Sequence, residues 1–288
     1  MAFSGTVRVR INGTWTTLTY NSSTGAYEAT ITAPGQTSFN LAGGVYEVLA
    51  EATNLAGTTS QKIGSLTVRE TVKPVITISS PSSGAYVSNN QQPIVFTVVD
   101  EANGSGVNIN SLVVKIDGKA VTSGISHSAI TNGYSVTVTP STLGDGSHTV
   151  TVDCSDNDGN AAAQKTTTFT VDTVPPTLNV TSPTEGFITN NPSLVVAGTT
   201  NDSTSSPVTL TVNDNVVSVG TNGSFSTTVT LKEGSNAITI KVVDKAGKTT
   251  TVTRNVTLDT SAPNIVSITI EPNPATTGAT MKVKVVVQ

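Results

Sequence analysis

Residues 146–159 read GSHTVTVDCSDNDG, and the same pattern recurs at 44–57 (GVYEVLAEATNLAG) and 234–247 (GSNAITIKVVDKAG). In each copy an Asn or Asp lies ten residues after the first glycine, and a second glycine lies thirteen residues after it. A pattern that recurs with fixed internal spacing is typical of an array of small similar units. The repeat therefore predicts a string of β-domains.

Inside the repeat the side chains alternate between polar and apolar types. Successive side chains of a strand point to opposite faces, so residues 147–155 would turn one set to solvent and the other to a core. The polar set is Thr149, Thr151 and Asp153, and the apolar set is Val150, Val152 and Cys154. This half-buried alternation is typical of a sandwich of two sheets.

Short runs of the same kind fill much of the chain, and helical periodicity is essentially absent. The runs are rich in Val, Ile and Thr and end at Gly, Asn, Asp or Pro, which predicts strands separated by turns. After Pro74 the predicted strands are 76–79, 94–99, 112–117, 134–139, 149–154 and 166–171. Strands this short and closely spaced predict an all-β sandwich with Greek-key connections.

Length and composition limit the classes of function. A chain of 288 residues suits two or three units of ~100 residues. A net charge of −4 with 12% charged residues and no Lys/Arg cluster predicts no nucleic-acid partner. With no run of about 18 apolar residues, we expect no membrane insertion. The first ten residues lack the apolar core of a signal peptide, so we expect a processed form or another export route.

Proline-bearing segments mark the predicted unit boundaries. They lie at 68–74, 171–176 and 258–263. Proline fixes φ and cannot donate a ladder hydrogen bond, so these segments predict short, fairly stiff linkers. The predicted division is a partial domain at 1–72, complete domains at 73–174 and 175–262, and the first two strands of a further unit at 263–288.

The two ends of the sequence are incomplete in complementary ways. Residues 9–13 (VRING) align with 114–118 (VKIDG), so segment 1–72 begins at the third strand of a unit. Segment 263–288 would supply the two strands that segment 1–72 lacks. We expect the two segments to pair head to tail between copies of the chain by strand addition, because pairing within one chain demands a sharp fold-back. The alternatives are that other proteins complete each end, or that the chain is a fragment.

Several motifs together resemble tandem bacterial immunoglobulin-like domains. They are PVITISSPSSG at 74–84, Asp100 with SGV at 105–107, VVKIDG at 113–118, the 156–159 turn and the VDTVPP joint at 171–176. The resemblance covers nearly the whole chain and implies tandem immunoglobulin-like sandwiches in an elongated array. Such modules occur in cell-surface adhesins, as spacers of extracellular enzymes and in bacteriophage virion proteins. The SGTVRVRINGTW start at 4–15 is most similar to prophage-encoded virion proteins of Gram-positive gut bacteria.

The sequence predicts no catalytic or cofactor site. Nucleophilic catalysis needs a base beside a Ser or Cys, and neither His127 nor His148 lies in a nucleophile motif. His148 is expected at the surface and Cys154 in the core, because their counterparts in other copies are polar or aromatic and apolar, respectively. The carboxylates of Asp100 and Glu101 are expected on opposite faces of a strand, unless the chain turns there.

The turn from Asp153 to Asp158 is the best metal candidate, because its clustered oxygens could hold calcium. Its counterparts keep only Asn54 and Asp244. An Asx-stabilised hairpin turn with glycine at positive φ suits all three copies and is the preferred interpretation, so no metal ligand is assigned. The joint acids Asp172 and Asp259, which Arg69 replaces in the first copy, are weaker candidates between domains.

The aromatic residues Trp15, Tyr20 and Tyr27 could anchor a carbohydrate or protein partner, but packing across strands is the preferred interpretation. The sequence thus predicts a non-enzymatic structural or adhesive appendage, most similar to a bacteriophage virion protein of the tail, baseplate or capsid surface. Its expected partners are itself, other virion or cell-surface proteins and a host-surface glycan. The alternative is a bacterial cell-surface adhesin or a spacer fragment of a larger secreted protein.

Overall fold

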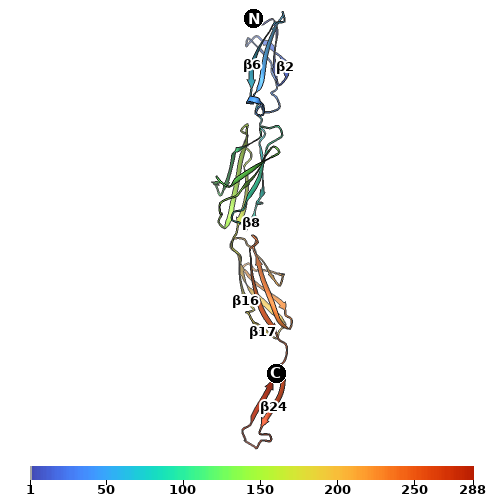
Figure 1. The fold of residues 1–288 in the computed structure, drawn as a ribbon, viewed down its shortest axis with the longest axis vertical. Helices are drawn as coiled ribbons and strands as arrows, with labels where there is room; N and C mark the ends of the chain where they lie inside the picture. Colours follow the sequence, from blue (N-terminus) through green and yellow to red (C-terminus); the bar gives the residue numbers. More distant parts are fainter. Residues whose placement is uncertain (1) are drawn as a thin grey trace. The chain divides into compact units, whose positions relative to one another are not determined.

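The structure is a computed structural model that describes residues 2–288. Its regular elements are strands, apart from one 3-10 turn at Ala42–Gly44, and Figure 1 shows them coloured along the sequence. Among the described residues, no helix is long and apolar enough to cross a membrane. The chain divides into two compact units, one up to Thr173 and one from Val174.

The first part of unit 1 is a four-stranded antiparallel sheet in the order β2-β1-β5-β6. Two shorter strands, β3 and β4, form a separate antiparallel hairpin. The bounds are β1 (Gly5–Ile11), β2 (Thr14–Thr17), β3 (Thr19–Asn21), β4 (Ala26–Glu28), β5 (Tyr46–Asn54) and β6 (Thr59–Leu66).

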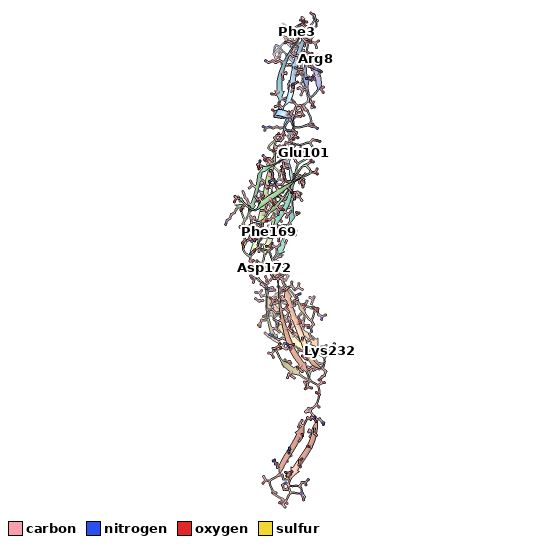
Figure 2. The ribbon with its side chains drawn as sticks, in the orientation of Figure 1. Phe3, Arg8, Glu101, Phe169, Asp172 and Lys232 are labelled. Carbon is pink, nitrogen blue, oxygen red and sulfur yellow. The ribbon has the colours of Figure 1, made fainter. Side chains whose placement is uncertain are left out.

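The second part of unit 1 is a sandwich of two sheets. One sheet has the order β11-β10-β14-β15-β8 and the other the order β12-β13-β9-β7. The bounds are β7 (Val75–Ser80), β8 (Ala85–Val87), β9 (Ile94–Val99), β10 (Val107–Ile116), β11 (Lys119–Ala120), β12 (Ile125–Ile130), β13 (Gly133–Val138), β14 (Gly146–Asp156) and β15 (Lys165–Val171). The core between the sheets includes Phe96 and Phe169, which are at most 1% exposed. Figure 2 shows Phe169 toward one end of this sandwich and Glu101 toward the other.

Unit 2 contains a second sandwich, built of sheets β16-β18-β21 and β17-β23-β22-β19-β20, and a separate hairpin β24-β25. The sandwich has its own core, which includes Val196, Leu210 and Ile240. The bounds are β16 (Thr177–Ser182), β17 (Phe187–Thr189), β18 (Ser193–Asn201), β19 (Thr209–Val212), β20 (Asn215–Val217), β21 (Ser224–Thr230), β22 (Gly234–Val243), β23 (Thr249–Leu258), β24 (Ile265–Glu271) and β25 (Lys282–Val287).

The predicted fold class is confirmed: the chain is all-β and carries tandem immunoglobulin-like sandwiches. The six strands predicted after Pro74 correspond to β7, β9, β10, β13, β14 and β15. The sequence pattern missed β8, β11 and β12. β8 and β11 are two or three residues long, and β12 is a mostly exposed edge strand, so none of the three shows a clear apolar alternation. The predicted domain limits stay predictions.

The three copies of the repeat form the same strand and turn. In each turn the side-chain Oδ1 of the Asx residue accepts a hydrogen bond from the N–H four residues later: Asn54 from Thr58, Asp156 from Asn160 and Asp244 from Lys248, at 2.8–2.9 Å. The glycine three residues after each Asx residue has φ between +82° and +97°, a region that L side chains rarely adopt. The Asx turn expected from the sequence is confirmed.

Candidate metal centre

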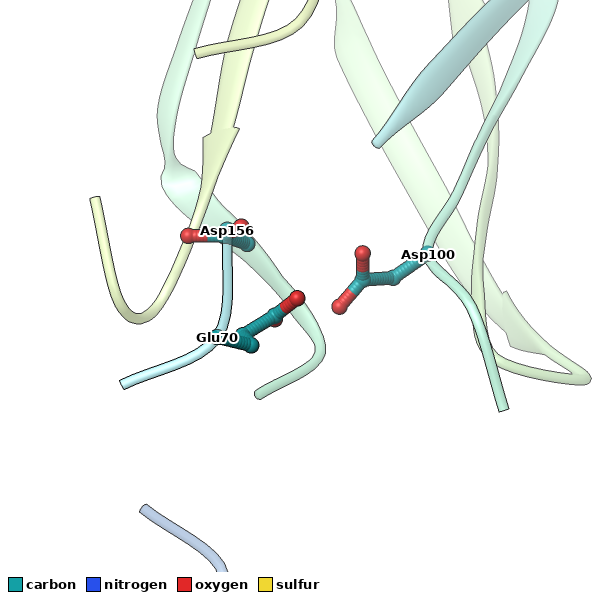
Figure 3. Close-up of side chains that lie close together, drawn as sticks. All are labelled: Glu70, Asp100 and Asp156. Carbon is teal, nitrogen blue, oxygen red and sulfur yellow. The ribbon is translucent and has the colours of Figure 1, made fainter. Parts of the chain in front are cut away.

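Three carboxylates of unit 1 come together where β9 and β14 end and where the chain leaves β6. Glu70, Asp100 and Asp156 each offer one oxygen, and these oxygens all lie within 4.8 Å of one another. Figure 3 shows the three side chains close together. Glu70 belongs to the proline-bearing segment, Asp100 directly follows β9, and Asp156 is the last residue of β14. Residues far apart in sequence thus form one acidic cluster.

Two of the carboxylates in this cluster each have an oxygen without a hydrogen-bond partner. Asp100 is 4% exposed; its Oδ2 accepts the Gly106 N–H at 2.8 Å, and its buried Oδ1 has no partner. Glu70 Oε1 accepts the Ser105 N–H at 2.8 Å, whereas its buried Oε2 has no partner. Buried charges that lack partners are costly and in native proteins are usually paired or bound to a metal. The two open oxygens therefore fit a bound cation.

Asp156 is the most deeply buried of the three residues, at 1% exposure. Its oxygens accept hydrogen bonds from the backbone N–H and the side-chain amide of Asn160, at 2.8 and 2.7 Å. A carboxylate oxygen has two lone pairs, so it can accept a hydrogen bond and still bind a cation. The Asx turn and the acidic cluster therefore use the same residue without conflict.

A fourth carboxyl group, that of Glu101, borders the cluster. Burial, together with the neighbouring carboxyl groups of Glu70 and Asp100, raises the pKa of Glu101 to about 8. Burial acts against the charged form of Glu70, but the neighbouring Glu101 carboxyl group and the Ser105 N–H outweigh it and lower the pKa of Glu70. The raised pKa of Glu101 favours its neutral form, which lessens the repulsion among the four acids.

Hydrogen bonds around the cluster tie the segment between β4 and β5, and the joint after β6, to the following sandwich. Asp158 Oδ2 accepts from Thr37 Oγ1 at 2.5 Å and from the Glu70 N–H at 3.0 Å. The Asn160 side-chain amide donates to the Glu70 carbonyl at 3.2 Å, and the Asn40 amide donates to the Gly104 carbonyl at 2.7 Å. These bonds fix Glu70 close to Asp100 and Asp156.

The donor set of the cluster suits calcium better than a transition metal. All candidate ligand atoms are oxygens, which calcium binds in sets of 6–8 at about 2.3–2.6 Å, whereas Cys and His favour zinc or copper. Two oxygens bound to one calcium ion lie at most about 5 Å apart, twice the Ca–O distance. The 4.8 Å limit for the cluster is within this span. Carbonyl groups or water would complete the ligand set.

The sequence predicted only some of the acids that form this cluster. Of the turn candidates, Asp156 belongs to the cluster, whereas Asp153 accepts hydrogen bonds from Gln164 and Asp158 from Thr37 and Glu70. The joint acid in the first copy is Glu70, one residue after the Arg69 to which the alignment pointed.

The remaining candidate acids lie in the other joints or at the end of a strand. The other joint candidates are Asp172, which is fully buried, and Asp259, which is exposed and accepts hydrogen bonds from Ser261. Asp100 and Glu101 do not point apart, because the chain leaves the strand after Val99, which is the exception that the sequence prediction allowed, and both carboxyl groups lie near the cluster.

His148 was expected at the surface, and that expectation was wrong. The ring is 9% exposed; Nδ1 lies 2.7 Å from Asp117 Oδ2, and Nε2 lies 2.8 Å from the Gly144 carbonyl oxygen. The ring also packs against Phe169, with 5.7 Å between centroids. Both ring nitrogens have partners in the protein, so the structure gives His148 a packing role. The expectation that Cys154 is buried is confirmed, at 4% exposure.

The aromatic residues near the start of the chain pack across strands. Tyr20 and Tyr27 face each other from β3 and β4, with 5.3 Å between ring centroids. The guanidinium carbon of Arg8 lies 4.2 Å from the Trp15 ring centroid. These contacts confirm the preferred interpretation of cross-strand packing.

Comparisons with known proteins agree with the fold. Residues 76–173 match the model of the bacterial Ig-like domain, and residues 176–260 match the model of glucodextranase domain B. No curated protein matches the chain.

Among solved structures, the chain is similar to the fibronectin(III)-like modules of Clostridium thermocellum CbhA, at 18% identity over 64% of this chain and 94% of that one, with a TM-score of 0.40. It is also similar to a 1.5-MDa bacterial ice-binding adhesin, at 23% identity over 90% and 88% of the chains with a TM-score of 0.32. A third similar structure is an I-band fragment of titin, at 12% identity over 88% and 87% with a TM-score of 0.41.

Proposed function

We propose that this chain is a non-enzymatic structural or adhesive protein of immunoglobulin-like domains that works outside the cell. In this proposal a calcium ion bound by Glu70, Asp100 and Asp156 fixes the joint between the first sheet and the next sandwich. The observation that carries it is the set of three carboxylates with oxygens within 4.8 Å of one another, one of which, Asp100, has a buried Oδ1 without a hydrogen-bond partner. Calcium sites of extracellular modules need to bind only at about 10⁻⁴–10⁻³ M.

The ion would act as a clamp on the joint. Without it, the carboxylates of Glu70, Asp100 and Asp156 repel one another in a poorly solvated space. With it, attraction to the cation replaces that repulsion and holds the segment that carries Glu70 against the ends of β9 and β14. A stiff joint suits a protein that must hold a surface away from the body to which it is attached.

Calcium titration of the full chain tests this function. We expect chelator-treated protein to bind Ca²⁺ more tightly than Mg²⁺ in calorimetry, because Mg²⁺ demands near-octahedral geometry. At a free concentration of 10–100 times its dissociation constant, Ca²⁺ should raise the free energy of unfolding of the part that holds the cluster by about 1.4–2.7 kcal/mol. Equal melting temperatures in Ca²⁺ and in chelator would refute the calcium site.

A matched pair of variants makes the test specific. D100N removes one charge from the cluster and should abolish most of the Ca²⁺ response, whatever it does to the stability of the ion-free protein. D153N removes a carboxylate from the same strand as Asp156, but Asp153 bonds only to Gln164 in this network, so its Ca²⁺ response should match that of the wild type. Equal Ca²⁺ responses of the two variants would contradict the assignment of Asp100.

Within this class we propose a setting on a bacteriophage particle, with other virion proteins and a host-surface glycan as partners. The resemblance of its first residues to virion proteins supports this setting. The alternative is a bacterial cell-surface adhesin or spacer. Mass spectrometry of purified particles and of cell-wall fractions from the source strain separates them: peptides of this chain in particles support the first, and peptides only in the wall fraction support the second.

A further inference from the structure

The hairpin β24-β25 has one apolar face that is exposed along its whole length. Cross-strand partners share a face of a sheet, and three apolar pairs lie on this one: Ile265–Val287, Ile268–Val285 and Ile270–Val283. All six side chains are 40–61% exposed. The opposite face carries the polar pairs Thr269–Lys284 and Glu271–Lys282 and the mixed pair Ser267–Val286. The hairpin is therefore amphipathic and presents its apolar face without a partner among the described residues.

The sheet of β1 and β5 has an apolar face that is only half covered. Its cross-strand pairs are Val7–Ala52, Val9–Ala50 and Ile11–Val48, and all six residues are partly exposed. In the aligned sequence of the complete sandwich, Val9, Val48 and Ala50 correspond to Val114, Val150 and Val152. These three counterparts are at most 1% exposed. A pocket of about 180 Å³ opens on this face, lined by Val9, Ile11, Thr14, Thr16, Ile31 and Pro34 among others.

The complete sandwich of unit 1 shows what covers such a face. There the antiparallel pair of β7 and β9, with pairs Ile76–Val98 and Ile78–Phe96, packs in one core with Val114 and Val150 of β10 and β14. The hairpin β24-β25 carries the same type of antiparallel apolar pairs, and β1 and β5 are the counterparts of β10 and β14. The chain thus holds both halves of one sandwich in two separate places.

Strand order gives a second, independent match. In the complete sandwich β9 pairs with β13, and the sheet order is β12-β13-β9-β7. The hairpin β3-β4 is a two-stranded sheet, and no described strand pairs with the outer edge of β4. Adding β25 beside β4 gives the order β3-β4-β25-β24, which reproduces the arrangement of the complete sheet. Backbone hydrogen bonds at that edge would add to the burial of the apolar face.

We infer that the β24-β25 hairpin of one copy docks onto the β1-β5 face of a second copy and completes its sandwich. A second copy is the occupant because the apolar pairs of the hairpin and those of the β1-β5 face correspond to the two facing sheets of one sandwich and lie on different segments. A contact between two different surfaces is heterologous, so it leads to a closed ring or an open filament. The inference does not depend on the calcium site.

The mass of the full-length protein in solution tests the inference. We expect light scattering to show at least a twofold increase over the mass of a single chain, rising with concentration unless a ring closes. V285D, which places a charge in the apolar face of the hairpin, should return the protein to a single chain. The control T269D, on the polar face, should assemble like the wild type. A wild-type protein that stays a single chain at every concentration overturns the inference.

Mixing two single-chain variants gives the sharper test. V9D damages the acceptor face and keeps the hairpin, whereas V285D damages the hairpin and keeps the acceptor face. Their mixture should form only a one-to-one dimer, because just one intact donor and one intact acceptor remain. Hydrogen exchange checks that each variant keeps its two complete sandwiches. Mixtures that stay single chains, or wild-type single chains whose hairpin amides are already protected, exclude docking between copies.

Discussion

The strands β5 and β14 carry the same repeat, yet only β14 lies over a sealed core. Val48 and Val150 both lie four residues after the first glycine of the repeat; Val150 is fully buried, and Val48 is only partly buried. The difference lies in the opposing sheet, because Ile94, Phe96 and Val98 of β9 cover Val150. Alternation thus decides which face of a strand is apolar, and only a second sheet decides whether that face is buried.

The largest expected effect comes from truncating this matched pair. V150A removes two methyl groups from a close-packed core and should cost about 1.5–3 kcal/mol in the free energy of unfolding. V48A should cost less than about 1 kcal/mol, because that side chain is still partly in water. Denaturant unfolding of both variants in the V285D background measures the contrast. Equal costs would mean that the β1-β5 face is sealed after all.

The turn glycines test whether the two regions also differ locally. Gly57 and Gly159 have φ of +82° and +97°, and no heavy atom lies within 4 Å of the point where a Cβ would stand. Replacing either by valine should cost about 1–3 kcal/mol through backbone strain alone. Near-equal losses for G57V and G159V in thermal unfolding would locate the difference between the regions in the opposing sheet. A harmless G159V would contradict the strained-turn interpretation.

The smallest effect is a pH dependence that only the sealed region should show. Burial lowers the pKa of His148, but hydrogen bonds to Asp117 and the Gly144 carbonyl outweigh it and raise that pKa. Burial raises the pKa of Asp117, but hydrogen bonds from the Thr149 N–H and from His148 outweigh it and lower that pKa. The raised histidine pKa stabilises the fold below about pH 6.5 and loses that effect as pH rises through the folded-state value. The lowered aspartate pKa stabilises above about pH 4 and loses its effect on acidification.

The stability lost in H148Q relative to wild type should therefore be larger at pH 5.5 than at pH 8, by no more than about 1 kcal/mol since Asp117 is partly exposed. Lys119 is the other charge that acts on Asp117, and K119Q should leave the trend in place. Tyr46 occupies the equivalent position of the repeat, so Y46F should show no comparable pH trend. If the stability difference between H148Q and wild type does not change with pH, the pair of His148 and Asp117 does not stabilise the fold as predicted.

The repeat carried enough information for the fold but not for the acidic cluster. Alternation in Val150, Val152 and Cys154 predicted the core, and the spacing of Asp156 and Gly159 predicted the turn, because both depend on neighbours in sequence. The cluster depends on long-range packing, which brings Glu70 to Asp100 from another segment. The alignment pointed to Arg69, and a search for any acid within one residue of each joint would have found Glu70.

His148 escaped prediction for a related reason. Its counterparts in the repeat are Tyr46 and Asn236, and a tyrosine and an asparagine in one column suggest a strand edge in water. The partners of the buried ring nitrogens are Asp117 and the Gly144 carbonyl, neither of which lies in the repeat. Polar residues that satisfy one another inside a fold leave no apolar pattern to read.

Labelling of the only cysteine of the chain can measure how often the sandwich in unit 1 opens. Cys154 lies on β14 in the core, and burial raises the pKa of its thiol. A thiol reagent therefore modifies it only when that domain opens, so the labelling rate under native conditions reports the frequency of opening. Calcium, chelator and chain concentration would each change that rate if they stiffen the domain, and the measurement needs no mutation at all.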